Sequence, residues 1–240
     1  MLYNVEAELT KSKKRQLKKD GTLKTGMKLQ NIEPLTQNQS YAFRAWERDR
    51  DLFMHGCAGT GKTLMAFYFA LRELQLENVD RVIVLRSVVP SRDMGFLPGS
   101  MAEKSQIFET PYYEICSTLY GRGDAYGILK EKKSIQFTTT SYIRGLTFDN
   151  AVVIVDECQN MAWHELNTIM GRIGNYTRVI FAGDTKQSDL DERHGKYDLH
   201  KMIEVIKRMG TFEFLQMMPA DVVRSGKAKK YILACEELGY

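Results

Sequence analysis

The sequence predicts an α/β fold in which a mostly parallel sheet is sandwiched between helices. Short runs rich in Val, Ile, Phe or Thr alternate along the chain with longer segments of helical periodicity, and this alternation is typical of doubly wound folds. The expected strands are 51–56, 81–86, 135–140, 151–155, 178–182 and 212–217. The expected helices are 36–49, 62–76, 101–119, 163–172, 197–209 and 227–238. A chain of 240 residues is enough for one generous domain with a buried core.

The first elements have clear local signals. Thr36 is placed to cap a helix in which Tyr41, Ala42, Ala45 and Trp46 recur at helical spacing. The run 51–56 that follows is apolar, short and closed by glycine, as expected for a buried parallel strand. The next helix, 62–76, begins directly after a glycine-rich turn. Each later strand candidate is likewise a short apolar run, and a helical pattern precedes or follows it.

Charge is distributed unevenly along the chain. Residues 1–30 hold eight lysines and arginines against three acidic residues, a net charge of +5, whereas the whole chain carries +4. These residues lack apolar periodicity, so we expect a flexible basic arm over 1–30 and a globular domain over 31–240. A basic arm is a common footprint for nucleic acid, because lysines that neutralise phosphates release counterions. The alternative is a solvated leader that binds nothing.

Composition excludes several classes of protein. No apolar run approaches the roughly 20 residues that a membrane helix needs, and the first residues do not resemble a secretory signal. The four cysteines form no CxxC pair and the four histidines show no metal-ligand spacing, so we expect neither a zinc site nor disulfides, and a reducing cytoplasm as the location. Five aromatic residues are expected to pack in the core, with a base-stacking platform as the alternative: Phe108, Tyr112, Tyr113, Tyr120 and Tyr126.

A phosphate-binding loop is the strongest chemical signal. The segment GCAGTGKT matches GxxxxGK[ST] between a predicted strand and a predicted helix, as the motif requires. Backbone N–H groups of such a loop surround the phosphates of ATP, Lys62 reaches the β and γ oxygens, and the Thr63 hydroxyl faces Mg²⁺. The expected nucleotide-binding residues are Gly56, Cys57, Ala58, Gly59, Thr60, Gly61, Lys62 and Thr63.

A pair of carboxylates is expected beside this loop. Asp156 ends the apolar run 151–155, and Glu157 follows it directly. Asp156 is expected to hold Mg²⁺ through water, and Glu157 to polarise the water that attacks the γ-phosphate. A second carboxylate aimed at water separates ATP hydrolases from most small-molecule P-loop kinases.

Two glutamines are weaker candidates. Gln187 follows the predicted strand 178–182, and strand ends converge on the nucleotide edge of a parallel sheet. It is expected to sense the γ-phosphate or to orient the water, although a plain polar loop is an open alternative. Gln39 precedes Gly56 by 17 residues and is expected to read the adenine edge. The alternative for Gln39 is an ordinary exposed helix residue.

Six segments in fixed order resemble those of PhoH-family ATPases, and through them the first RecA-like domain of superfamily 1 helicases. They are GCAGTGKT, RDMGFLPG at 92–99, YIRG at 142–145, VDECQN at 155–160, GDTKQSD at 183–189 and DVVR at 221–224. The resemblance covers about residues 35–231. It implies a RecA-like ATPase domain that often assembles as a hexameric ring and is linked to RNA unwinding or RNA metabolism. It also implies an arginine that touches the γ-phosphate, with Arg224 the first candidate and Arg144 the second.

Three functions remain open on the sequence. The leading one is a Mg²⁺-dependent ATPase that couples hydrolysis to movement on single-stranded nucleic acid, most of all RNA. Since the chain has room for one RecA-like domain, neighbouring subunits of a ring would supply the missing face. The second is a nucleotide-gated binding module with little turnover, and the third is a kinase that acts on a small metabolite.

Overall fold

Six parallel strands form a single sheet at the centre of the molecule. The computed structural model describes residues 26–87, 101–184 and 192–238, without the side chains of 101–106 and 192–197. The strands are β1 (Asp51–Gly56), β2 (Arg81–Arg86), β3 (Ile135–Thr139), β4 (Ala151–Asp156), β5 (Arg178–Gly183) and β6 (Phe212–Met217). Their order in the sheet is β3-β2-β4-β5-β1-β6, and every neighbouring pair is parallel. The α/β fold class predicted from the sequence is confirmed.

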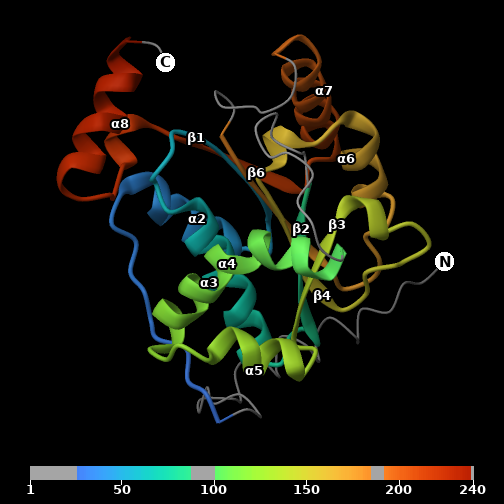
Figure 1. The fold of residues 1–240 in the computed structure, drawn as a ribbon. Coiled ribbons are helices and arrows are strands. Elements are labelled where there is room, and N and C mark those ends of the chain that lie inside the picture. The colour runs from blue at the N-terminus through green and yellow to red at the C-terminus, as the bar shows by residue number, and fades with distance from the viewer. Residues whose placement is uncertain (1–25, 88–100, 185–191, 239–240) are drawn as a thin grey trace.

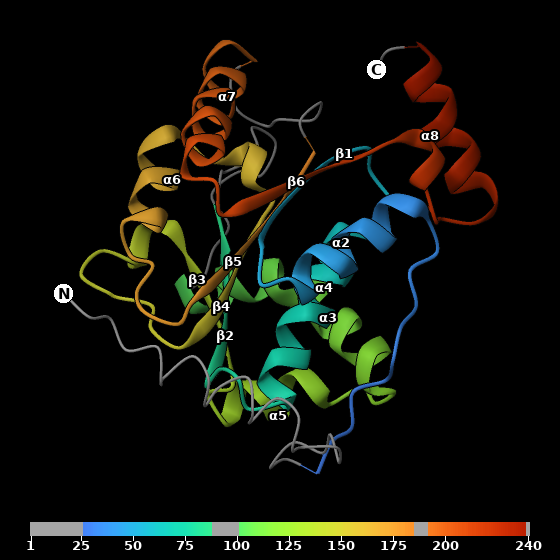
Figure 2. The ribbon, with the colours of Figure 1, turned by 180° about the vertical axis from the view of Figure 1, so that it is seen from behind.

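Helices cover both faces of this sheet. They are α2 (Gln37–Glu47), α3 (Lys62–Gln75), α4 (Met101–Tyr120), α5 (Ala125–Glu131), α6 (Trp163–Met170), α7 (Glu192–Met209) and α8 (Gly226–Leu238). Helices α2 to α5 lie on one face and α6 and α7 on the other, whereas α8 lies apart, next to the short helical turn η3 (Pro219–Asp221) (Figures 1 and 2). Two further turns, η1 (Thr140–Tyr142) and η2 (Cys158–Asn160), follow the carboxyl ends of β3 and β4.

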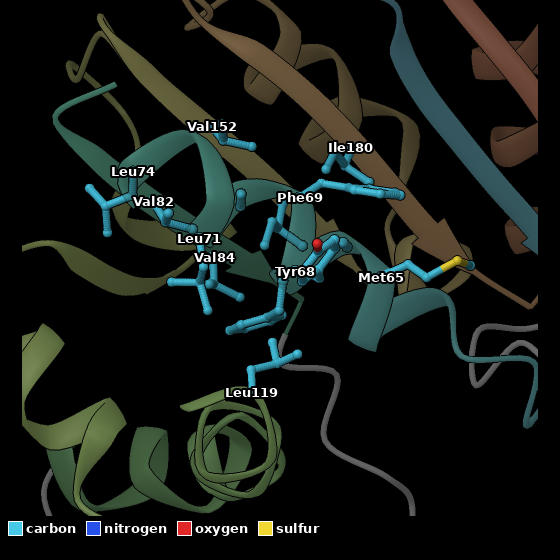
Figure 3. Close-up of a cluster of buried hydrophobic side chains, with 14 of the residues drawn as sticks. Met65, Tyr68, Phe69, Leu71, Leu74, Val82, Val84, Leu119, Val152 and Ile180 are labelled. Carbon is cyan, nitrogen blue, oxygen red and sulfur yellow. The ribbon is translucent and has the colours of Figure 1, made fainter. Parts of the chain in front are cut away.

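Alternation along the strands builds a core on each face. Leu52, Val84 and Ile154 pack on the α3 side of the sheet, and Phe53 and Val153 pack on the α7 side. Side chains that successive strand residues send to opposite faces explain this division. Figure 3 shows the first core, in which α3 lies between the strands and α4. Its labelled side chains are Met65, Tyr68, Phe69, Leu71, Leu74, Val82, Val84, Leu119, Val152 and Ile180.

The sequence placed the strand cores correctly, and the structure differs mainly at the ends of elements. β3 ends one residue earlier than expected, β4 and β5 each run one residue further, and α6 stops at Met170 because the chain turns at Gly171. Helix α5 was not expected. Its sequence AYGILKE is only seven residues long and contains a glycine, so it carries too little periodicity to be recognised.

The expected arm over 1–30 extends too far into the chain. Met27 and Leu29 are buried in the apolar core, and two hydrogen bonds hold this segment: the Leu29 N–H donates to Gln75 Oε1 (2.8 Å) and the Gln30 N–H to the Leu119 carbonyl (2.8 Å). The last residues of the expected arm therefore belong to the folded domain. Residues 1–25 lie outside the described residues, and the division into arm and domain otherwise stays a prediction.

The remaining expectations concern aromatic packing, cysteines, metal ligands and membrane helices. Tyr112, Tyr120 and Tyr126 are buried as expected, whereas Tyr113 is 40% exposed. All four cysteines are free. In the described part of the chain, no three His, Cys, Asp or Glu side chains gather as metal ligands, and no helix is long and apolar enough to cross a membrane.

Candidate nucleotide-binding site

The carboxyl ends of four neighbouring strands meet at one edge of the sheet. Strand register aligns Arg86 of β2 with Asp156 of β4, and Asp156 with Ala182 of β5. The same register aligns His55 of β1 with Gly183 of β5. Because the strands are parallel, the loops that follow them open on this edge, which is where ligands bind in open α/β sheets.

The predicted phosphate-binding loop connects β1 to α3 and is shaped by glycines. Gly56, Gly59 and Gly61 adopt φ values of 106°, 71° and 83°, in the left-handed region that glycine tolerates best. A side chain at Gly56 would meet the Met217 carbonyl of β6. Thr60 Oγ1 donates to the Cys57 carbonyl (3.0 Å) and fixes the turn from within. The three glycines and the Thr60 bond thus shape a tight turn that leads directly into the N-terminus of α3.

Lys62 is buried inside this loop. Its Nζ donates to the carbonyls of Gly56 and Cys57, both at 2.8 Å. Burial lowers the pKa of Lys62, while the charges of Asp184 and Glu157 act in the opposite direction. The ammonium group thus lies where the phosphates of a nucleotide would enter, and it is held there by neutral acceptors.

Asp156 joins β4 to the phosphate-binding loop. Its Oδ1 accepts a hydrogen bond from Thr63 Oγ1 (3.0 Å) and its Oδ2 accepts one from Tyr112 Oη of α4 (2.9 Å). Burial raises the pKa of Asp156, the neighbouring Glu157 raises it further, and the two hydroxyl donors and Arg86 lower it. A hydroxyl beside a carboxylate supplies the oxygen ligands that Mg²⁺ takes.

Glu157 is presented by an unusual backbone. Its φ of 52° lies in the left-handed region, which costs a non-glycine residue roughly 1–3 kcal/mol and which Asp49 and Asn150 also adopt outside the site. Gln159 Nε2 donates to Glu157 Oε2 (2.6 Å), and Gln159 Oε1 accepts the Asp184 N–H (2.9 Å). Gln159 therefore ties Glu157 to the end of β5. Sequence reasoning assigned no role to Gln159, although it lies inside the quoted VDECQN segment.

The two arginine candidates lie in different places. Arg224 lines the same pocket as Lys62, and a Cβ at Gly59 would lie 2.8 Å from Arg224 Cγ. The Val223 N–H donates to the Gly59 carbonyl (3.1 Å), which fixes the DVVR segment on the loop of its own chain. Among the described residues Arg224 forms no salt bridge. Arg144 is exposed in the connection between η1 and β4 and does not line the pocket.

Gln39 is buried against the phosphate-binding loop. Its Nε2 donates to the Thr60 carbonyl (3.0 Å), and its Oε1 accepts the Leu35 N–H (2.7 Å). The alternative of an exposed helix residue is wrong, because Gln39 is buried and only 5% of its surface is exposed. Its predicted contact with adenine stays a prediction. Gln187 and the 92–99 segment lie outside the described residues.

The phosphate-binding loop, Asp156, Glu157 and Arg224 line one common pocket. It has a volume of about 460 Å³ and is lined by Ala58, Gly59, Thr60, Gly61, Lys62, Thr63, Leu64, Ile115, Asp156, Glu157, Ala182, Gly183, Asp184, Val223 and Arg224. A cationic side chain, a glycine-rich loop and a hydroxyl–carboxylate pair fit a nucleoside triphosphate with Mg²⁺. The fold and the site together define a P-loop NTPase domain.

The particular family follows from sequence comparison. The family model for PhoH-like proteins matches residues 31–236, and the chain belongs to this family. The PhoH-like protein of Mycobacterium leprae is 31% identical over 196 residues, 80% of this chain and 55% of that protein. The PhoH-like protein of Synechocystis is 32% identical over 208 residues, 85% and 62% of the two chains. The chain thus spans little more than half the length of these relatives.

Two solved structures are also similar, at low identity. The Sulfolobus solfataricus SWI2/SNF2 ATPase core in complex with dsDNA is 12% identical, with a TM-score of 0.45, over 78% of this chain and 47% of that one. The Pif1 helicase from Candida albicans is 17% identical, with a TM-score of 0.39, over 78% and 41% of the two chains.

Proposed function

We propose that the chain is a Mg²⁺-dependent ATPase that couples hydrolysis to the binding or unwinding of single-stranded nucleic acid, and of RNA in the first place. The observation that carries the proposal is the single pocket in which Lys62, Thr63, Asp156, Glu157 and Arg224 meet. A binding module needs the first three. A carboxylate held toward the pocket by Gln159 and an arginine without an acidic partner among the described residues favour hydrolysis.

The residues divide the chemistry between them. Lys62 exchanges its two loop carbonyls for phosphate oxygens, at small cost because both partners are acceptors. Thr63 and Asp156 would hold Mg²⁺, the latter through water, and the bound ion would neutralise charge on the β and γ oxygens. Glu157 takes a proton from the attacking water. Arg224 meets the charge that spreads over the γ-phosphate as its bond to the leaving oxygen breaks.

RNA and a ring of subunits belong to the same proposal. A single RecA-like domain offers one face to a nucleic acid strand, and a neighbouring subunit of a hexameric ring would supply a second face. The net charge of +5 over residues 1–30 supports contact with phosphates. The four free cysteines accord with a reducing cytoplasm. Gln187 keeps its proposed role in sensing the γ-phosphate.

One assay separates this function from its alternatives. Phosphate release from ATP is measured with and without single-stranded RNA, and products are analysed by chromatography. Hydrolysis that RNA stimulates is the expected result. Tight ATP binding with negligible turnover would instead identify a nucleotide-gated module. Transfer of the phosphate to a metabolite would identify a kinase.

A further inference from the structure

Both oxygens of the Asp156 carboxylate are held by hydroxyl groups from different helices. Thr63, at the start of α3, donates to Oδ1, and Tyr112, in the middle of α4, donates to Oδ2. A carboxylate on a Cβ has two side-chain torsions, and two donors from opposite sides determine both. The second donor is remote in the sequence, since 44 residues separate Tyr112 from Asp156.

Tyr112 is itself held rigidly. The residue is fully buried, and its ring stacks on Phe67 of α3 with centroids 5.0 Å apart and an interplanar angle of 22°. Phe67 follows Thr63 by one helical turn, so the same face of α3 supplies the hydroxyl and the ring that supports Tyr112. The ring of Phe137 in β3 also lies beside the Tyr112 ring, with the two centroids 5.9 Å apart.

Helix α4 is anchored as well, by a second buried tyrosine–carboxylate pair. Glu109, one turn before Tyr112, accepts hydrogen bonds from Tyr126 Oη of α5 (2.8 Å) and from Lys130 Nζ (2.7 Å). This pair lies outside the nucleotide pocket. In both pairs a buried tyrosine donates to a buried carboxylate with a cation beside it, Lys130 in this pair and Arg86 next to Tyr112. The Glu109 pair has no contact with the phosphate-binding loop.

We propose that Tyr112 is a positioning residue that fixes the Asp156 carboxylate for Mg²⁺. The proposal rests on the Mg²⁺-dependent function proposed above and adds a residue to it. A hydroxyl that binds one oxygen leaves the remaining lone pairs of Asp156 directed toward the metal, as outer-shell partners do for metal ligands. Without it, Asp156 can rotate away from Thr63, and the free energy gained on binding the ion decreases.

Tyr112→Phe tests the proposal because it keeps the stacked ring and removes only the hydroxyl. The dissociation constant of a fluorescent ADP analogue is measured once in EDTA and once in Mg²⁺. The ratio of the two constants gives the coupling between metal binding and nucleotide binding. We expect the affinity in EDTA to stay unchanged and the coupling to fall by about 10- to 100-fold. The matched control is Tyr126→Phe, which removes the equivalent bond to Glu109 and should leave the coupling intact. Thermal unfolding of both variants compares their stability.

The outcomes are distinct. Loss of coupling in Tyr112→Phe but not in Tyr126→Phe supports the proposal. Equal coupling in Tyr112→Phe and the parent overturns it, as does equal loss in both variants, which would reflect a general loosening of α4. A parent protein whose ADP affinity is the same with Mg²⁺ and with EDTA would overturn the metal-dependent function itself, and the role of Tyr112 with it.

Discussion

Glu157 enters the pocket from a left-handed backbone conformation and accepts a hydrogen bond from Gln159. If it removes a proton from the attacking water, Glu157→Gln should bind ATP as the parent does and hydrolyse it at least about 100-fold more slowly, because general-base contributions run to about 10²–10⁴. Phosphate release and equilibrium binding of ATP measure the two effects separately.

Two further variants make this comparison specific. Lys62→Ala should lose nucleotide binding, since Lys62 is the buried cation of the loop. Glu165→Gln changes a carboxylate at the same edge of the sheet that accepts a hydrogen bond from Ser87 (3.1 Å) and does not line the pocket. Its turnover should match that of the parent. Near-parental turnover in Glu157→Gln would remove Glu157 from the mechanism.

Arg224 lies on the phosphate-binding loop of its own chain, and the expected effect of its removal follows from that position. Arg224→Ala should lower turnover by a factor of about 10³–10⁵, which is the contribution to rate of arginines that stabilise charge on a transferring phosphoryl group. Arg144→Ala tests the second candidate: because Arg144 is exposed and outside the pocket of its own chain, its removal should lower turnover only if it acts on a neighbouring subunit.

Mixing experiments locate the subunit in which Arg224 acts. In mixed oligomers, Arg224→Ala subunits combined with Lys62→Ala subunits should stay inactive if each arginine serves its own pocket. Recovery of activity on mixing would instead place Arg224 across a subunit interface. Full activity of Arg224→Ala on its own would exclude it from the site.

Helix α2 is fastened to the DVVR segment by Asp221, which is buried at the start of that segment. Its Oδ2 accepts hydrogen bonds from Asn38 Nδ2 (2.6 Å) and the Met218 N–H (2.9 Å). Burial acts to raise the pKa of Asp221, but the hydrogen bonds from Thr36, Met218 and Asn38 outweigh it and leave the pKa below its usual value of 3.8. The contact thus stabilises the folded state in the ionised form.

This shift predicts how stability depends on pH. A depressed folded-state pKa contributes stability above the unfolded value near 3.8, and the contribution is lost as pH falls through the folded value. Asp221→Asn should therefore reduce the free energy of unfolding at pH 7 and lose less of it on acidification than the parent. Urea unfolding at a series of pH values measures this. Asp80→Asn, at an exposed position, should follow the parent curve, and an Asp221→Asn curve parallel to the parent's would contradict the assignment.

The elements also show what sequence patterns can and cannot predict. Five-to-six-residue runs identified the six strands. The signal is clearest in the four inner strands, because burial on both faces leaves few polar residues there. Asp156 was found because it ends such a run, and Arg224 because the DVVR segment resembles a helicase motif. Tyr112 was expected only to pack, and its ring does so. Its hydroxyl meets Asp156 through a contact across 44 residues, which no local pattern encodes.

For the molecule as a whole, the basic arm predicts how RNA binding responds to salt. Six of its charges cluster at Lys11, Lys13, Lys14, Arg15, Lys18 and Lys19. If each neutralises one phosphate, log affinity should change with log salt with a slope of about −4, a loss of roughly 300-fold between 50 and 200 mM. Fluorescence anisotropy of a labelled single-stranded RNA measures the slope.

Deletion of residues 1–25 should flatten that slope while leaving Met27 and Leu29 in the core. Replacing the six clustered charges with glutamine in the full chain is the matched control, because it keeps the length of the arm. Both variants should behave alike. A slope that neither change affects would show that the arm is a leader without a role in binding, and that nucleic acid contacts the folded domain.

The order of the strands has a consequence for how the family can diverge. β5 lies between β1 and β4, so two strand spacings of roughly 4.8 Å separate the strand that precedes the loop from the strand that ends at Asp156. The phosphate-binding loop and the start of α3 span that interval, and the Thr63–Asp156 hydrogen bond joins them to the end of β4. Main-chain hydrogen bonds set the interval, whatever side chains the strands carry. Substitutions that change the apolar core can therefore accumulate without changing the width of the nucleotide site.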